Sequence, residues 1–428
     1  MNTWKKIVSM GIAFSLIGSL AACGGGSDQG AEGDGGQVTI TYARGKDQTQ
    51  TTKKLIEEFE KEHPQMDIRF KEMPSDTGVS HDQYVTMFSG NSDEIDVFDL
   101  DVIWSAEFAQ AGYLQPLDRF IQKDGIDLDK YVNGAVKAGR YNGKQWTMPK
   151  FVDAGLLYYR KDMVDEEDVP KTWEALTEQA EELKGEQGTS FGYVFQGKQY
   201  EGLVCNFIEL IGAYGGRVLD EQGKVVIDSK GTVEGLRKLR EMAQSDYVPG
   251  HVTAITEIET DAIYSEGQAV FSRQWPYHYA KMQEDGSDVM GKVGVAALPQ
   301  GDAGSTAALG GWMTGINKNS KHKKEAWELI KFMNGAKGQK ISAVDGGLAP
   351  TYLPLYQDED VKKASPLFEN EEFIKGVKSA VPRPVSPEYP KISDIIQVEV
   401  SKTIAGEEKP ENAVKRMEQK LKKVVEGG

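Results

Sequence analysis

Residues 38–70, VTITYARGKDQTQTTKKLIEEFEKEHPQMDIRF, predict a strand, a helix and a second strand in that order. Apolar and polar residues alternate at 38–42 and again at 66–70, which is the period of a strand. Between them the apolar residues of 55–59 recur at helical spacing, and Pro64 marks the end of that helix. Two strands joined through a helix form a crossover, so this stretch indicates a sheet with parallel strands.

The same alternation continues outward along the chain. We expect further strands near 97–100, 156–159, 191–195, 269–271, 293–295 and 314–316, with helices between them. From about residue 340 onward the apolar spacing is almost entirely helical. Strands that alternate with helices predict an α/β protein, and 428 residues require more than one sheet.

The N-terminus has the layout of a secretory signal. Two lysines precede an apolar run from residue 7 to 20, which is shorter than the roughly 20 residues of a membrane-spanning helix. Leu20 to Cys23, LAAC, resembles the lipobox of bacterial lipoproteins, where the signal is cut before a cysteine that carries lipid. We therefore expect a signal peptide at 1–22, lipidation at Cys23, and a glycine-rich tether at 23–36. The folded part would then lie on the extracytoplasmic face of the bacterial membrane.

Composition excludes several classes of protein. There are 50 lysines and arginines against 66 aspartates and glutamates, a formal charge of −16, which argues against binding to nucleic acid. The only cysteines are Cys23 and Cys205, so lipidation of the first leaves no pair for a disulfide. No phosphate-binding GxxxxGK[ST] loop and no zinc-binding HExxH pair occurs. A glycosidase remains open, because its two carboxylates could be any of 66.

Aromatic and acidic residues gather where the expected strands end. In open α/β sheets ligands bind beyond such strand ends. A pyranose needs carboxylates that accept hydrogen bonds from its hydroxyls and flat rings that cover its C–H surface. Packing in the core is the commoner role for a residue such as Trp104, and Asp99 or Asp101 could instead cap the next helix. The candidates are Asp99, Asp101 and Trp104, then Asp153, then Trp275 and Tyr277, then Gly311 and Trp312.

Eight motifs in order resemble the family 1 extracellular solute-binding proteins of ABC transporters, and within them the trehalose/maltose-binding branch. They are the lipobox with its tether, 153–162, 170–173, FQGKQYEGL at 195–203, WPY at 275–277, KVGVAALP at 292–299, 309–312 and 381–384. The resemblance implies a two-lobed periplasmic-binding-protein fold of class II, with the ligand cleft at the hinge. It implies an N-terminal lobe of 37–152 and 303–336 and a C-terminal lobe of 153–302 and 337–428.

The resemblance also implies roles for individual residues. Asp101 and Asp153 would accept sugar hydroxyls, Trp275 would stack on the sugar, and Arg383 would donate to sugar oxygens. Gly311 and Trp312 match the ligand segment of the first lobe, and the family's first binding position falls at Gly45–Gln48, where we place it at Asp47. Tyr200 and Glu201, within FQGKQYEGL, complete the expected set.

We therefore expect a lipid-anchored, monomeric sugar-binding subunit of an ABC importer, with no enzymatic activity, no cofactor and no metal. Its ligand would be an α-glucoside disaccharide such as trehalose or maltose, and its partners the permease subunits of the transporter. The alternatives are a secreted glycosidase with paired cleft carboxylates and the same fold with another oligosaccharide. An anionic sugar ranks low, because Arg383 is the only cation among the candidates.

Overall fold

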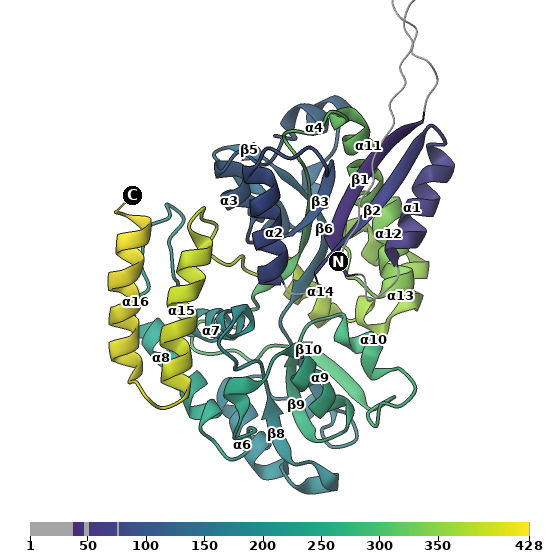
Figure 1. The fold of residues 1–428 in the computed structure, drawn as a ribbon. Helices are drawn as coiled ribbons and strands as arrows, with labels where there is room; N and C mark the ends of the chain where they lie inside the picture. The colour runs from purple at the N-terminus through teal and green to yellow at the C-terminus, as the bar shows by residue number, and fades with distance from the viewer. Residues whose placement is uncertain (1–36, 47–50, 75–76, 428) are drawn as a thin grey trace, which may run out of the picture. The chain divides into compact units, whose positions relative to one another are not determined.

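The computed structural model describes residues 37–46, 51–74 and 77–427, and Figure 1 shows their secondary structure. Its first sheet has the strand order β2-β1-β3-β11-β6. Strands β1 and β2 pair in parallel, and α1 connects them in the sequence. The crossover expected from the opening stretch is therefore confirmed. Strand β11 returns antiparallel between β3 and β6. The strands are β1 (Val38–Gly45), β2 (Met66–Met73), β3 (Val97–Asp101), β6 (Thr147–Ala154) and β11 (Leu309–Ile316).

Helices from both ends of the chain pack around this first sheet, and a two-stranded hairpin accompanies them. They include α12, which lies beside α1 although more than 270 residues separate them in sequence, and α13, which packs on α12 (Figure 1). The helices are α1 (Thr51–Glu62), α2 (Thr77–Ser89), α3 (Ser105–Gln110), α4 (Asp118–Asp124), α5 (Asn133–Ala138), α11 (Lys323–Met333), α12 (Ala336–Gly346) and α13 (Glu359–Ala364). The hairpin is β4 (Arg140–Tyr141) with β5 (Lys144–Gln145).

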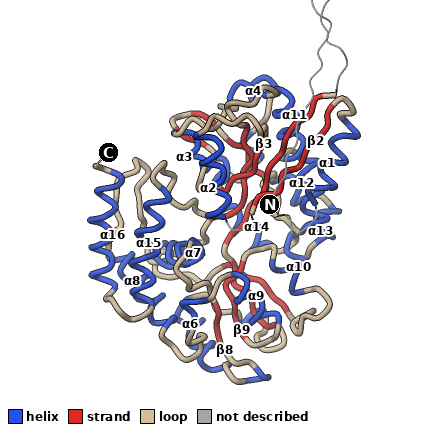
Figure 2. Tube along the Cα trace, in the orientation of Figure 1, coloured by secondary structure: helices blue, strands red, loops and turns tan. Residues whose placement is uncertain are grey.

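The second sheet has the order β10-β7-β9-β8, in which only β8 and β9 are parallel. Its strands are β7 (Leu156–Arg160), β8 (Phe191–Val194), β9 (Ala269–Gln274) and β10 (Val293–Ala297). Figure 2 shows the strands of both sheets in red, with helices around them. The helices associated with this part are α6 (Trp173–Leu183), α7 (Glu201–Ala213), α8 (Lys230–Ala243), α9 (Glu257–Ser265), α10 (His278–Met282), α14 (Glu371–Ser379), α15 (Tyr389–Ile404) and α16 (Pro410–Val425).

Local sequence signals account for these elements. The Thr172 side chain accepts a hydrogen bond from the Ala175 amide and caps α6, as its position before the apolar helical pattern predicts. Trp173, the first residue of that helix, is almost fully buried, so packing is its role here. The apolar residues on both sides of Gly223 predict a hairpin at 218–227, but the segment forms only a bridge between Leu219 and Val225 around a turn. Too few backbone pairs form there to make two strands.

The packing of α12 and α13 differs from the expected lobe boundary. Ending the N-terminal lobe at residue 336 assigned these helices to the second lobe, yet α12 packs on α1 and α11, and α13 packs on α12. The turn between α11 and α12 is short, so the second helix folds back at once on the first. The chain passes between the sheets after β6, after β10 and again after α14.

Across 37–46, 51–74 and 77–427, no helix combines the length and the apolar character that crossing a membrane requires.

Candidate functional site

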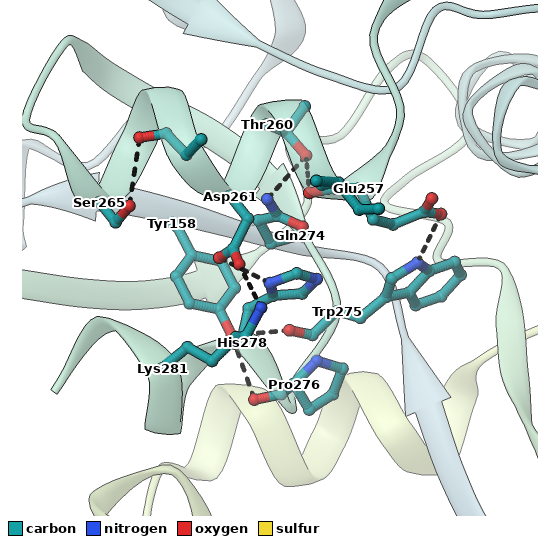
Figure 3. A network of polar contacts seen from close by, with 12 residues as sticks. Tyr158, Glu257, Thr260, Asp261, Ser265, Gln274, Trp275, Pro276, His278 and Lys281 are labelled. Carbon is teal, nitrogen blue, oxygen red and sulfur yellow. Dashed lines mark hydrogen bonds and ion pairs between the residues drawn. The ribbon is translucent and has the colours of Figure 1, made fainter. Parts of the chain in front are cut away.

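The Trp275 side chain is fixed on three sides at the end of β9. Its ring lies over the Arg273 guanidinium, with 3.8 Å between the ring centroid and Cζ. Its indole Nε1 donates to Glu257 Oε1 at 3.3 Å, and its backbone carbonyl accepts from the Tyr158 hydroxyl at 2.9 Å (Figure 3). Residues two apart on a strand share a face, which is why Arg273 and Trp275 meet. The ring is therefore held in one orientation by the second sheet.

Arg273 is itself held by a buried ion pair. Its Nε donates to Glu209 Oε2 at 3.0 Å and its Nη2 to Glu209 Oε1, and both side chains are essentially inaccessible to solvent. Glu209 Oε1 also accepts from the Ala308 amide at 3.2 Å, in the connection between β10 and β11. A buried pair of this kind satisfies both charges only while both partners are present. The support beneath Trp275 thus includes α7 and an inter-sheet connection.

Two glycines let the first sheet approach the Trp275 ring. A Cβ on Gly310 would lie 3.2 Å from a carbon of that ring and 3.1 Å from the Asp153 Cβ. Gly311 has φ of +110°, and a Cβ there would overlap the Phe151 carbonyl oxygen. Glycine at position 310 therefore leaves room for the Trp275 ring and for Asp153, which both lie close to this point of β11.

Asp153 offers an unused acceptor in this place. It pairs through its backbone with Gly310 and is 8% exposed. No residue in the described part of the chain donates a hydrogen bond to its carboxylate. Burial and, to a smaller extent, the negative charge of Asp101 raise the pKa of Asp153 to about 7, while Arg273 acts in the opposite direction. The group is thus a buried carboxyl that hydroxyl donors could satisfy.

Arg383 joins residues from both sheets. Its Nη2 donates to Asp101 Oδ1 at 3.1 Å, at the end of β3, and its Nη1 donates to Glu201 Oε1 at 2.7 Å, at the start of α7. The hydroxyls of Tyr389 and Ser393 also donate to Glu201. Burial raises the pKa of Asp101, and Arg383 opposes that rise. The expected sugar-binding residues Asp101, Glu201 and Arg383 therefore bind one another.

Two further candidates lie in the interior of the first lobe. Asp99 is 1% exposed, and its carboxylate accepts from the Tyr42 hydroxyl at 2.7 Å, from Lys150, and from the Thr314 hydroxyl at 3.0 Å. Trp104 is buried in an aromatic cluster and stacks on Phe108. Asp99 and Asp101 do not occupy the N-cap position of α3. That position is Trp104, whose side chain makes no capping hydrogen bond. Asp99 and Trp104 thus have protein partners in the core.

Tyr200 and Tyr277 border the group around Trp275, whereas Trp312 lies against Trp104. The Tyr200 hydroxyl donates to Glu257 Oε2 at 2.6 Å, and the Tyr277 ring lies against the His278 ring with centroids 4.2 Å apart. The half-buried Trp312 meets Trp104 edge to face at 5.9 Å. Asp47 and Cys23 lie outside the described residues.

A cavity of about 850 Å³ lies beside Arg383. Of the expected sugar-binding residues only Arg383 lines it, and its Nε has no hydrogen-bond partner in the described part of the chain. Other lining residues are Lys137, Arg217, Asp220 and Pro382. Neither Trp275 nor Asp153 is among the residues that line this cavity.

Two residues of this site were not anticipated from the sequence. Glu257 holds two of the candidate aromatic side chains, and Arg273 lies beneath one of them. A signal for Arg273 was available, because a charged residue interrupts the apolar strand before Trp275. Nothing in the sequence singles out Glu257, since acidic residues are common in the first turn of any helix.

Comparison with known proteins gives consistent matches over most of the chain. Residues 45–340 match the model of the family described as bacterial extracellular solute-binding protein. A probable ABC transporter-binding protein of Deinococcus radiodurans is 33% identical over 83% of this chain and 86% of its own length.

Two solved structures are also similar. The maltose-bound MalE3 of T. maritima has a TM-score of 0.82 at 38% identity, covering 90% of this chain and 99% of that one. The GacH receptor of Streptomyces glaucescens, solved unliganded and with acarbose, has a TM-score of 0.79 at 25% identity, covering 91% and 99%.

Proposed function

Since the chain belongs to the family of bacterial extracellular solute-binding proteins, we propose that it binds a sugar and delivers it to an ABC importer. The ligand is an α-glucoside disaccharide of the trehalose or maltose type. The two-lobed periplasmic-binding-protein fold expected from the sequence is confirmed by the likeness to MalE3. A cleft between two lobes can enclose a small solute, and release then requires only hinge motion.

One observation carries the proposal, which is the unpartnered Asp153 carboxylate next to the fixed Trp275 ring. A pyranose has an apolar C–H face that stacks on an indole and hydroxyls at its rim that donate to a carboxylate. Trp275 follows β9 of the second sheet and Asp153 lies in β6 of the first, so one sugar can contact residues held by both sheets. Contacts that form only when the lobes are together favour the closed state.

Two observations on similar proteins support the choice of sugar. MalE3 of T. maritima binds maltose, and the GacH receptor binds acarbose. The remaining expected contacts, namely Asp47, Asp101, Tyr200, Glu201, Tyr277, Gly311, Trp312 and Arg383, belong to the proposed site. For Asp101, Glu201 and Arg383, sugar hydroxyls would have to replace or share the present ion pairs.

Delivery completes the proposal. The signal at 1–22 would direct export and be removed, and the lipid on Cys23 with the tether at 23–36 would then hold the monomeric protein at the membrane. Attachment through a flexible tether raises the concentration of the loaded protein near the permease subunits. A membrane fraction that retains the wild-type protein and releases a Cys23→Ser variant would support this part.

The binding test uses calorimetry with maltose and trehalose on wild-type, Trp275→Ala and Asp153→Ala proteins. We expect each substitution to weaken binding by at least about tenfold, or ~1.4 kcal/mol. Trp146→Ala is the control, because it removes an indole from β5–β6 whose Nε1 donates to the Tyr141 carbonyl, away from β9. Unchanged affinity in both site variants would remove the basis of the proposal.

A glycosidase is the second candidate, because a carboxyl with a pKa near 7 beside a second carboxylate fits an acid and base pair. Residues 188–192, GTSFG, match the GxSxG sequence motif of serine hydrolases. In those enzymes the motif joins a strand to a helix, whereas here it leads into strand β8, so it does not form a nucleophile elbow. Free glucose after incubation of the purified protein with maltose would favour hydrolysis over binding.

A further inference from the structure

Helix α9 presents three polar side chains on one face. Glu257, Thr260 and Asp261 are three and four residues apart, which places them along one side of a helix. Figure 3 shows these side chains directed at the end of β9 and the residues after it, from Gln274 to His278. That segment contains Trp275 and Tyr277, two of the proposed sugar-binding residues.

Glu257 holds two aromatic side chains with one carboxylate. Oε1 accepts from the Trp275 indole Nε1 at 3.3 Å, and Oε2 accepts from the Tyr200 hydroxyl at 2.6 Å. Hydrogen bonds to an ionised acceptor are stronger than neutral ones and fix the donor more firmly. The plane of the indole is therefore set by Glu257 at its edge and by Arg273 beneath its face.

Asp261 supports the other aromatic residue indirectly. Oδ1 lies 2.8 Å from His278 Nδ1, and Oδ2 accepts from Lys281 Nζ at 2.6 Å. His278 is 2% exposed, and the Tyr277 ring rests against its imidazole. Thr260 lies between these two acidic residues on the helix. Its hydroxyl accepts a hydrogen bond from the side-chain amide of Gln274 at 2.8 Å, which fixes the end of β9.

We propose that Glu257 and Asp261 are positioning residues for the sugar site, which set the orientation of Trp275, Tyr200 and Tyr277 before ligand arrives. The inference rests on the proposed function, because it concerns how those rings meet a sugar. A ring that is already ordered loses less conformational freedom on binding than a ring that must be immobilised. Rings held by supporting hydrogen bonds therefore bind more tightly than the same rings without them.

The cap of α9 is separate from these contacts. The Thr256 amide and hydroxyl both donate to Glu259 Oε2, which completes a capping box without Glu257. Glu257 and Glu259 both lie in the first turn, so removing either carboxylate costs similar interaction with the helix dipole. Glu259→Ala is therefore a matched control for Glu257→Ala.

The first measurement is affinity for maltose by calorimetry, together with thermal unfolding. We expect Glu257→Ala to weaken binding about tenfold, and Glu257→Gln, which keeps one acceptor, to restore part of that loss. Asp261→Asn should weaken binding less, because it acts on Tyr277 only through His278. Glu259→Ala should lower the unfolding temperature and leave the affinity unchanged. Equal affinities for wild-type and Glu257→Ala proteins would overturn the inference.

The second measurement needs no sugar. In the ligand-free protein, the indole ¹⁵N–¹H resonance of Trp275, assigned through Trp275→Phe, should shift in Glu257→Ala and stay in place in Glu259→Ala. An unshifted resonance in Glu257→Ala overturns the positioning role whatever the ligand is. A wild-type protein that binds neither maltose nor trehalose overturns the proposed function instead, so the two failures are distinguished.

Discussion

Asp153 illustrates how a single residue can cost stability and serve binding at once. It is buried, it accepts no hydrogen bond within the described part of the chain, and Asp101 lies close enough to raise its pKa further. A carboxylate in this condition gains from any donor that enters, so a sugar hydroxyl would find an acceptor with no competing protein partner. At this scale, function and stability make opposite demands on the same side chain.

We expect Asp153→Asn to stabilise the ligand-free protein at pH 8 and to change little at pH 4. The pKa of Asp153 is raised from 3.8 to about 7, so between these values the folded state binds more protons than the unfolded state. The contribution of Asp153 to the free energy of unfolding is fully present below about pH 4. It falls as the pH rises from there through 7. Asparagine cannot ionise, so it avoids that loss, which for a shift of about three pKa units is on the order of 4 kcal/mol.

Thermal unfolding at both pH values checks this prediction. Asp285→Asn, on an exposed turn, is the control and should give equal unfolding temperatures to wild type. An Asp153→Asn variant with the same advantage at pH 4 as at pH 8 would show that ionisation is not the cause.

At the scale of elements, β9 depends on charge neutralisation inside the second sheet. The strand is fully buried, and Arg273 lies within it against Glu209 of α7. This pair connects the strand, the helix and the support of the Trp275 ring. Breaking it would therefore disturb both the packing of the sheet and the candidate site.

We expect Glu209→Gln to lower the free energy of unfolding by about 3 kcal/mol, because it leaves the Arg273 charge buried without its partner. The double variant Glu209→Leu with Arg273→Met should recover much of that loss, since it removes both charges together. Denaturant unfolding measures both values. A double variant as unstable as the sum of its single substitutions would show that the two residues act independently.

At the scale of the whole molecule, Arg383 is a direct polar link between the sheets. It lies on the last connection between them and pairs with Asp101 of β3 and Glu201 of α7. Because the guanidinium is buried, these ion pairs are weakly screened by salt. The link therefore favours close approach of the lobes even without sugar.

We expect Arg383→Met to increase the radius of gyration of the ligand-free protein in small-angle X-ray scattering, because both carboxylates lose their shared partner. Arg416→Met is the control, since Arg416 pairs with Glu399 and Glu408 within the α15–α16 region. It should leave the radius unchanged. Equal scattering from Arg383→Met and wild-type proteins would show that this link does not hold the lobes together.

Much of the candidate site was predictable from residue type and position after a strand. Position 310 lies close to both the Trp275 ring and Asp153, and Gly311 lies beside the Asp153 backbone. That these residues bind sugar stays a prediction. Asp99 follows the same rule of position but faces Tyr42 and Lys150 in the core. Alternation along a strand shows which residues share a face, but it does not show whether that face meets solvent or other side chains.

The sequence by itself determined most of the strands and helices but not β6, and it determined the parallel crossover at 38–70 and the acidic, cysteine-poor character of the chain. These follow from local spacing, because backbone hydrogen bonding fixes the periods of helix and strand. Only the tertiary structure decided that α12 packs on α1 and that Arg383 pairs with Asp101, 282 residues away. Such pairs depend on distances through space, which spacing along the chain does not encode.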